Sequence, residues 1–181
     1  MTFTPTKIPD VILIAPRLFE DARGFFYEGY RRDVFAANGI PAEFVQDNYS
    51  KSAKGTVRGL HYQVPPKAQA KLIQVLRGAV FDVAVDLRRG SPTFGQWVGR
   101  ALSSANHHLL HIPTGFAHGF CALEDETLVM YKVSDVYSPA HERGLLWNDP
   151  ALRIDWPMLD VGYQLSERDR RYPLLKDAVL E

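Results

Sequence analysis

Short apolar segments, each closed by a glycine or a proline, dominate this chain and limit what it can fold into. The 181 residues include 13 glycines and 12 prolines, spread along the whole length. Between them lie segments rich in valine, isoleucine, phenylalanine and tyrosine: DVILIAP, GFFYEGY, AKLIQVL, AVFDVAVDL, TFGQWVGRAL, HHLLHIP, HGFCAL and TLVMYKVSDVY. Many short strands separated by turn residues are typical of a sandwich or a barrel. We therefore predict an all-β fold.

Helical patterning is scarce, and it predicts only short helices at the periphery. Residues 31–39, RRDVFAANG, fit a short helix ended by Gly39. Residues 166–172, SERDRRY, fit a second one, with Ser166 as the N-cap residue and Asp169 three positions later. A proline follows directly and would stop this helix.

Length and charge narrow the class of protein. The length fits one domain over residues 1–181. With 21 basic and 21 acidic residues the formal net charge is +0, which argues against general nucleic-acid binding. Cys121 is the single cysteine and suits a reducing compartment. No segment approaches the ~20 apolar residues of a membrane span, and no signal peptide is apparent. We expect a cytoplasmic protein with no membrane partner.

The segment AVFDVAVDL, residues 79–87, has one wholly apolar face. Alternation along a strand puts two carboxylates on the opposite face. This pattern fits the wall of a barrel, and the carboxylate face would line a polar cavity or meet solvent. The segment alone does not decide between the two. The apolar face holds Phe81, Val83, Val85 and Leu87, and the other face Val80, Asp82, Ala84 and Asp86.

The strand-like segment VRGLHYQ, residues 57–63, combines a cation, a glycine and an imidazole. His61 shares a face with Gln63, whereas Arg58 lies on the other face unless Gly59 introduces a bulge. One interpretation is a strand end with an exposed arginine and a structural histidine. The other is a proton-transfer histidine in an anion-binding pocket, since histidine suits proton transfer near neutral pH.

Residues 111–120, HIPTGFAHGF, contain the spacing P-x-G-x-x-H that ends at His118. This spacing resembles the second motif of the cupin superfamily, a double-stranded β-helix, in which the histidine usually ligates a metal. The His-x-His pair of the first motif would begin six residues after Gly78, where Ala84 and Asp86 stand instead. A divalent metal needs about three protein ligands. The resemblance therefore implies a cupin-type jelly-roll barrel without a metal or other cofactor. Taken alone, His118 also fits a core histidine.

Lys71 and Tyr131 stand in apolar strand-like segments and are ambiguous. A lysine with apolar flanks is either solvated or points its ammonium into a cavity, and a tyrosine in a strand most often belongs to the core.

Six segments together resemble the dTDP-4-dehydrorhamnose 3,5-epimerase family. They occur in the family order and spacing, from about residue 3 to about residue 175. The segments are DARGFFYE, residues 46–97 (QDNYSK to FGQW), IPTGFAHGF, residues 131–150 (YKVSDVY to WNDP), IDWP and SERD.

The resemblance implies epimerisation at C3 and C5 of dTDP-4-dehydro-6-deoxy-D-glucose, giving dTDP-4-dehydro-L-rhamnose. The C4 ketone acidifies the hydrogens on both carbons. His61 would be the base, and Asp169 would orient its imidazole. Lys71 would place a positive charge near O4, with His118 close by, and Tyr131 would be the acid on the opposite face.

The resemblance also implies a binding set for the sugar nucleotide and a homodimer. Arg168 stands where lysine is more usual, and Val57 stands where leucine is common. The N-terminal strands would cross to the partner subunit, and the apolar VILI run would make a sheet edge prone to association if left unpaired. The binding set comprises Arg23, Glu28, Gln46, Asn48, Arg58, His118, Glu142 and Arg168.

Two alternatives stay open on the sequence. The first is a mono-epimerase or a ketoisomerase of a related dTDP-4-keto-6-deoxy sugar. The second is a non-catalytic sugar-binding cupin, which would have little need for the four catalytic groups together.

Overall fold

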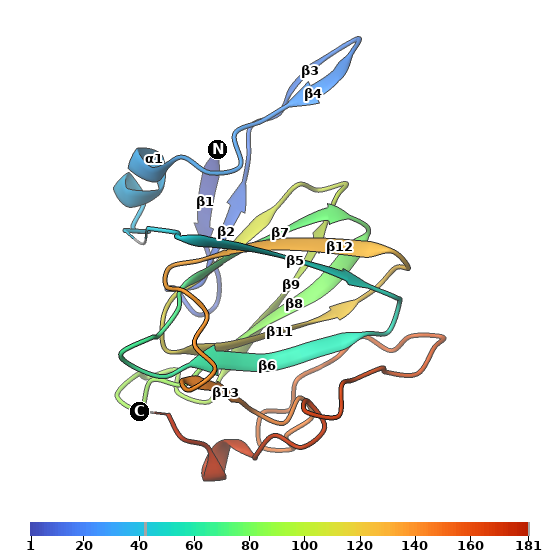
Figure 1. The fold of residues 1–181 in the computed structure, drawn as a ribbon. Helices are drawn as coiled ribbons and strands as arrows, with labels where there is room; N and C mark the ends of the chain where they lie inside the picture. The colour runs from blue at the N-terminus through green and yellow to red at the C-terminus, as the bar shows by residue number, and fades with distance from the viewer. Residues whose placement is uncertain (42, 181) are drawn as a thin grey trace.

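Two antiparallel sheets stacked as a sandwich form the body of the protein (Figure 1). The structure is a computed structural model and describes residues 1–41 and 43–180. The order in the first sheet is β1 (Thr2–Pro5), β2 (Ile12–Ala15), β10 (Leu109–Ile112), β7 (Lys71–Arg77), β12 (Thr127–Val133) and β5 (Gln46–Ser52). The order in the second is β13 (Glu142–Gly144), β6 (Val57–Gln63), β11 (Phe116–Ala122), β8 (Ala79–Asp86) and β9 (Trp97–Ser103). The predicted all-β fold is confirmed.

The main core lies between the two sheets. Alternate residues of the central strands point inward and meet across the sandwich, as the period of two requires. Ile73 and Val75 of β7 contribute from the first sheet, and Val80 and Ala84 of β8 contribute from the second. All four are at most 2% exposed, so the two sheets are closely packed against each other at this core.

The carboxylate face of β8 points into the sandwich, and neither carboxylate meets solvent. Asp82 and Asp86 are both fully buried. The wholly apolar face points the other way and packs under the C-terminal segment, which contributes Leu152, Trp156 and Leu175. The sequence pattern predicted the correct alternation, but the layer that covers the apolar face comes from the distant C-terminal segment of the chain.

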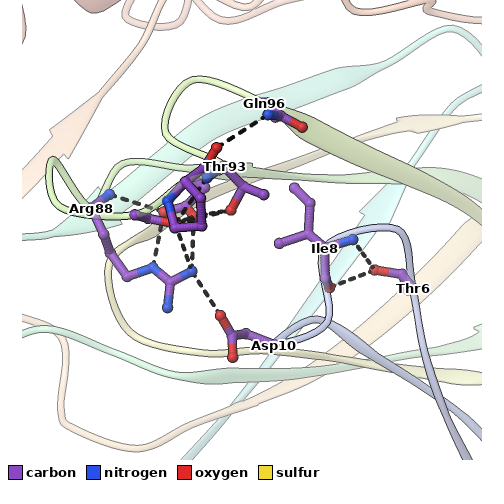
Figure 2. Close-up of polar contacts among 9 residues, drawn as sticks. Thr6, Ile8, Asp10, Arg88, Thr93 and Gln96 are labelled. Carbon is purple, nitrogen blue, oxygen red and sulfur yellow. Dashed lines mark hydrogen bonds and ion pairs between the residues drawn. The ribbon is translucent and has the colours of Figure 1, made fainter.

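Asp86 anchors the loop that follows β8. Its two oxygens accept hydrogen bonds from the guanidinium of Arg88 and from the hydroxyls of Ser91 and Thr93, at 2.6–2.9 Å. Arg88 also donates to Asp10 at 2.8 Å, which ties this loop to the β1–β2 connection (Figure 2). Burial raises the pKa of Asp86, but these hydrogen bonds outweigh it and lower the pKa to about 2.

One predicted helix is present and the other is not. Helix α1 (Arg32–Ala37) is followed by Gly39 at a φ of +83°, as the sequence indicated. Residues 166–172 form a turn instead, although Ser166 does accept the expected capping bond from the amide of Asp169 at 3.1 Å. The Asp169 side chain is instead bonded to His61 of β6 at 2.7 Å, so this turn is held by a contact with a distant strand. A short 3₁₀ helix, Leu175–Asp177, lies further on.

A two-stranded hairpin, β3 (Phe19–Asp21) with β4 (Gly24–Phe26), projects away from the sandwich (Figure 1). Neither helix in the described ranges has the length or the apolar run that a membrane crossing requires.

Candidate active site

A polar cavity of about 570 Å³ opens between the two sheets. Both sheets, the loop before β13 and the turn at residues 166–169 contribute to its wall. Ten of the twelve residues singled out from the sequence line it: Gln46, Asn48, Arg58, His61, Lys71, His118, Tyr131, Glu142, Arg168 and Asp169.

A bulge in β6 brings Arg58 and His61 to the same cavity. The pairing of β6 with β11 shifts register between His118 and Phe120, and His118 stands directly opposite His61. Gly59 lies inside this irregularity, at a φ of +132°. A Cβ there would come within 2.5 Å of the Gly119 Cα, so only glycine allows this approach. The alternative raised by the sequence, a bulge at Gly59, is what the structure has.

His61 forms a hydrogen-bonded pair with Asp169. The imidazole Nε2 lies 2.7 Å from Oδ1 of Asp169, whose side chain is 6% exposed. Burial is the largest single influence and raises the pKa of Asp169, but the hydrogen bond and charge of His61, the hydrogen bond from Ser166 and the charge of Arg168 together outweigh it and lower the pKa. The Tyr172 ring packs edge-on to the imidazole, with centroids 5.7 Å apart. Gly144 of β13 pairs with His61 of β6. Because Gly144 has no Cβ, it leaves room for the Tyr172 ring.

His118 forms a second pair, with a carboxylate behind the cavity wall. Its Nε2 lies 2.9 Å and 3.1 Å from the two oxygens of Asp82. Burial lowers the pKa of His118, and Asp82 opposes this effect. His118 is 6% exposed and Asp82 is fully buried, so the pair is held by the inner faces of two neighbouring strands.

Lys71 begins β7 and points its ammonium into the same wall. Its Nζ donates to the backbone carbonyl of His61 at 3.2 Å. Burial lowers the pKa of Lys71 to about 8, while the charges of Asp82 and Glu142 keep it from falling further. A buried ammonium beside a cavity acts as a strong, fixed positive charge toward whatever occupies it.

Tyr131 lies on the opposite sheet from His61. It belongs to β12, where it stands opposite Asn48 on one side and Ile73 on the other. Burial raises the pKa of its hydroxyl, so the phenol is protonated at neutral pH. The cavity therefore has an imidazole on one wall and a phenol on the other.

A cluster of polar groups lines the cavity rim. Glu142 accepts hydrogen bonds from Arg168 at 2.7 Å and from the hydroxyl of Tyr137 at 2.8 Å. Gln46 accepts from the backbone amide of Tyr137 at 3.0 Å and donates to Asn48 at 2.8 Å. The rim groups thus hold one another in place.

Arg23 and Glu28 are the two predicted residues that the structure keeps out of this cavity. Arg23 lies in the turn of the projecting hairpin and pairs with Asp21. Glu28 is half exposed, 3.7 Å from Arg31.

Sequence reasoning did not assign Tyr137 to the site, although it lines the cavity and donates to Glu142, nor Asp82 and Tyr172, which contact His118 and His61. The alternation along β8 had placed Asp82 on a polar face, and this was a usable signal. Tyr137 and Tyr172 stand in irregular segments, where no periodicity in the sequence predicts which way a side chain points.

Within residues 1–41 and 43–180, no group of three or more histidine, cysteine or acidic side chains is arranged to hold a metal ion. Ala84 stands directly opposite His118, and Asp86 is engaged with Arg88. The two positions where a cupin would carry His-x-His are therefore unsuited to ligation.

Fold and site define a cupin-like β-sandwich whose cavity carries acid–base side chains. The sequence profile described as dTDP-4-dehydrorhamnose 3,5-epimerase matches residues 5–177. A Pseudomonas aeruginosa protein of that name is 55% identical over 179 residues, which cover 98% of each chain. A dTDP-4-dehydrorhamnose 3-epimerase from Streptomyces niveus is 44% identical over 180 residues, 98% of this chain and 86% of that one.

A crystal structure of a Legionella pneumophila dTDP-6-deoxy-D-glucose-3,5-epimerase, in complex with dTDP-4-keto-L-rhamnose, has the same fold. It superposes with a TM-score of 0.93 at 47% identity, covering 97% of this chain and 93% of that chain. The chain belongs to the dTDP-4-dehydrorhamnose 3,5-epimerase family and is an epimerase.

Proposed function

We propose that this enzyme inverts C3 and C5 of dTDP-4-dehydro-6-deoxy-D-glucose, giving dTDP-4-dehydro-L-rhamnose. The observation that carries the proposal is the opposition of His61, paired with Asp169, to Tyr131 on the facing sheet. Inversion at carbon requires a base on one face and an acid on the other. The ligand of the Legionella relative supports the choice of sugar.

His61 removes the proton. The C4 ketone makes the hydrogens on C3 and C5 acidic, and neutral imidazole is a suitable base near pH 7. The Asp169 carboxylate, 2.7 Å from Nε2, fixes the imidazole tautomer and stabilises the imidazolium that forms. The other ring nitrogen is then the one that accepts the substrate proton.

Lys71 stabilises the charge that develops on O4 when the proton leaves. The electron pair from the broken C–H bond becomes an enolate, and the buried ammonium lies in the wall of the same cavity. Tyr131 then donates its hydroxyl proton to the opposite face of the carbon, which inverts the centre. The two stereocentres require two such cycles.

The rim binds the diphosphate and the nucleoside. Arg58 lines the cavity and donates to Ser52 at 3.1 Å, which leaves part of its guanidinium for a phosphate. Gln46 and Asn48 of β5 offer amides on the same side. Arg168 keeps the positive charge of the lysine that is more usual there, and its bond to Glu142 fixes its position.

The active form is a homodimer in this proposal. The apolar run on β2 does not supply a free edge, because β1 and β10 pair with it on both sides. The support comes instead from exposed apolar side chains: Phe25 and Phe26 on the projecting hairpin are 56% and 66% exposed, and Tyr49 on the outer sheet face is 64% exposed. The hairpin would carry Arg23 to the partner's cavity. If light scattering at micromolar concentration shows a monomer, and that monomer has full activity, the proposal is wrong.

The other expectations from the sequence also belong to the proposal. The protein acts in the cytoplasm, in keeping with its buried free thiol, Cys121. It takes no nucleic-acid or membrane partner. It also works without a metal or other cofactor.

One alternative is favoured by a specific relative, the 3-epimerase from Streptomyces niveus. Such an enzyme would invert C3 alone. Incubating the substrate in D₂O and following both carbons by NMR separates the cases. Deuterium at C3 and C5 supports double epimerisation, and deuterium at C3 alone supports the mono-epimerase. No exchange at either carbon would point to a binding protein or to a different sugar.

Two variants test the assignment of base and acid. His61→Ala should abolish both exchange and epimerisation, a loss of about a hundredfold to ten-thousandfold. Tyr131→Phe keeps the ring and removes only the hydroxyl. Exchange should then persist, because His61 returns a solvent-derived deuteron to the original face, while inverted product falls. Wild-type inversion by Tyr131→Phe would remove the tyrosine from the mechanism.

A further inference from the structure

The imidazole of His61 is hydrogen-bonded to Asp169 through one ring atom, which leaves open how the ring is oriented. This bond fixes Nε2 at 2.7 Å from the carboxylate. The torsion that turns a histidine ring about its Cβ–Cγ bond has broad minima, so it does not select one ring plane by itself. A catalytic base must present its free nitrogen to the reacting bond within about 0.5 Å and 20°. A second contact is needed to fix the plane of the ring.

The aromatic ring of Tyr172 makes that contact. It packs edge-to-face against the imidazole of His61, with ring centroids 5.7 Å apart and ring planes at 68°. Aromatic pairs favour this arrangement at such a distance. The imidazole thus has two contacts of different kinds, a polar one at Nε2 and an aromatic one on the ring.

Tyr172 is itself confined, because a glycine lies against its ring. A Cβ on Gly144 would come within 2.5 Å of three ring carbons, Cδ2, Cε2 and Cζ. Gly144 stands directly opposite His61 in the pairing of β13 with β6. The ring therefore packs on the backbone of the strand that pairs with His61, and a larger residue at position 144 would push it away.

Two further contacts keep the Tyr172 ring in this place. The guanidinium of Arg168 lies over the ring, with its Cζ 5.9 Å from the centroid, and Arg168 is bonded to Glu142 at 2.7 Å. The backbone next to the ring is anchored as well, since the carbonyl of Pro173 accepts a hydrogen bond from the amide of Leu146 at 2.8 Å. The ring thus has a fixed place from which it can hold its neighbour.

The role that this geometry allows is one of shape. The contacts with His61, Gly144 and Arg168 are all made by the Tyr172 ring. Burial raises the pKa of the hydroxyl to about 12, so the side chain is neutral near pH 7. The described residues that line the cavity do not include Tyr172, so it acts on a substrate through His61.

We propose that Tyr172 is a positioning residue for the base, and that its ring holds the His61 imidazole in the plane in which Nδ1 points at the substrate carbon. The inference rests on the proposed function, since it takes His61 as the base. It gives the two neighbours of His61 separate tasks. Asp169 sets which nitrogen carries the hydrogen, and Tyr172 sets the direction of the other nitrogen.

Tyr172→Leu tests the proposal, because it removes the aromatic ring and keeps an apolar side chain. The value of kcat should fall by about tenfold to a hundredfold, since a displacement of about 1 Å can cost a hundredfold in rate. KM should change little, because Tyr172 acts through His61. Tyr172→Met fills more of the space and gives the same test with less loss of packing. Tyr172→Phe keeps the ring and should restore kcat to near the wild-type value.

NMR of protein labelled at the histidine rings separates positioning from general support of the fold. In Tyr172→Leu, nitrogen NMR should still find the hydrogen of His61 on Nε2, because Asp169 is intact. Carbon relaxation should show a larger amplitude of motion for the His61 ring than in wild type or in Tyr172→Phe.

Tyr163→Leu is the matched control. Tyr163 is also half-buried in the C-terminal segment and also packs T-shaped on an aromatic ring, that of Trp147, with centroids 4.9 Å apart. Its replacement should lower the free energy of unfolding, as Tyr172→Leu should. It should leave kcat and the motion of the His61 ring unchanged.

Three results would overturn the proposal. One is a wild-type kcat in Tyr172→Leu and Tyr172→Met. Another is a raised KM with normal kcat, which would mean that Tyr172 acts on binding through Arg168. The third is an equal loss in Tyr172→Phe and Tyr172→Leu, which would assign the effect to the hydroxyl.

Failure of the proposed function would look different. His61→Ala would then keep exchange at C3 and C5, whereas carbon relaxation would still show a looser His61 ring in Tyr172→Leu.

Discussion

Gly59 has a backbone conformation that favours glycine, packs closely against β11 and lies two residues from His61. We expect Gly59→Ala to reduce both stability and activity. Its φ of +132° is one that alanine rarely adopts. An added Cβ would stand 2.5 Å from the Gly119 Cα and 2.9 Å from the carbonyl oxygen of His118. Both are backbone atoms of β11, which cannot rotate out of the way.

The expected cost has two parts. Forcing alanine into this conformation costs about 1–3 kcal/mol, and overpacking against fixed atoms adds about 1–3 kcal/mol. Together these are a large share of the ~5–15 kcal/mol that stabilises a typical domain. Relief of the contact must push β6 and β11 apart, which separates His61 from His118. Because a displacement of about 1 Å can cost a hundredfold in rate, kcat/KM should fall by about that factor.

Gly24→Ala is a matched control for the strain. Its φ is +126°, and nothing lies within 4 Å of the position a Cβ would take. The assay is urea unfolding of both variants and wild type, with kcat/KM measured below the transition. The free energy of unfolding should fall further in Gly59→Ala than in Gly24→Ala. Because both variants carry the backbone strain, the difference between them should equal the cost of overpacking. If the two variants lose equal stability and Gly59→Ala keeps wild-type kcat/KM, the close approach of β6 to β11 has no functional weight.

Four further predictions follow from the site and its support. Asp86→Asn should lower the unfolding free energy at pH 7 by about 2–3 kcal/mol, because a pKa lowered from 3.8 to about 2 stabilises the fold above pH 4. That stabilisation is lost as pH falls toward 2, so acid titration of wild type should show it and the variant should not. Lys71→Ala should reduce turnover by about a hundredfold to a thousandfold with little change in KM; a raised KM with normal turnover would assign Lys71 to binding. Gly144→Ala would place a Cβ 2.5 Å from the Tyr172 ring and should lower kcat/KM, and adding Tyr172→Ala should recover the stability that the clash removes, as a double-mutant cycle would show. Chelators should leave activity unchanged, and restoration of chelator-lost activity by a divalent ion would contradict this.

The sequence by itself determined the elements and most of the chemistry. Short β-branched and aromatic runs between glycines and prolines predicted the strands, because these residues act through local backbone preference. Gly39 ended α1 for the same reason. The spacing of His61, Lys71 and Tyr131 matched the family motifs, and the fold brings them to one cavity.

Only the tertiary structure decided which faces are buried, and by what. The alternation along β8 put Asp82 and Asp86 on one face, but strand order and the C-terminal segment made that face interior. The turn at residues 166–169 is likewise set by contact, since the Asp169 side chain is committed to His61, 108 positions away in sequence. Which residues of a strand share a face follows from the local sequence. Which layer covers that face depends on contacts between distant segments. For that reason the pairing of His118 with Asp82 was visible only in the folded protein.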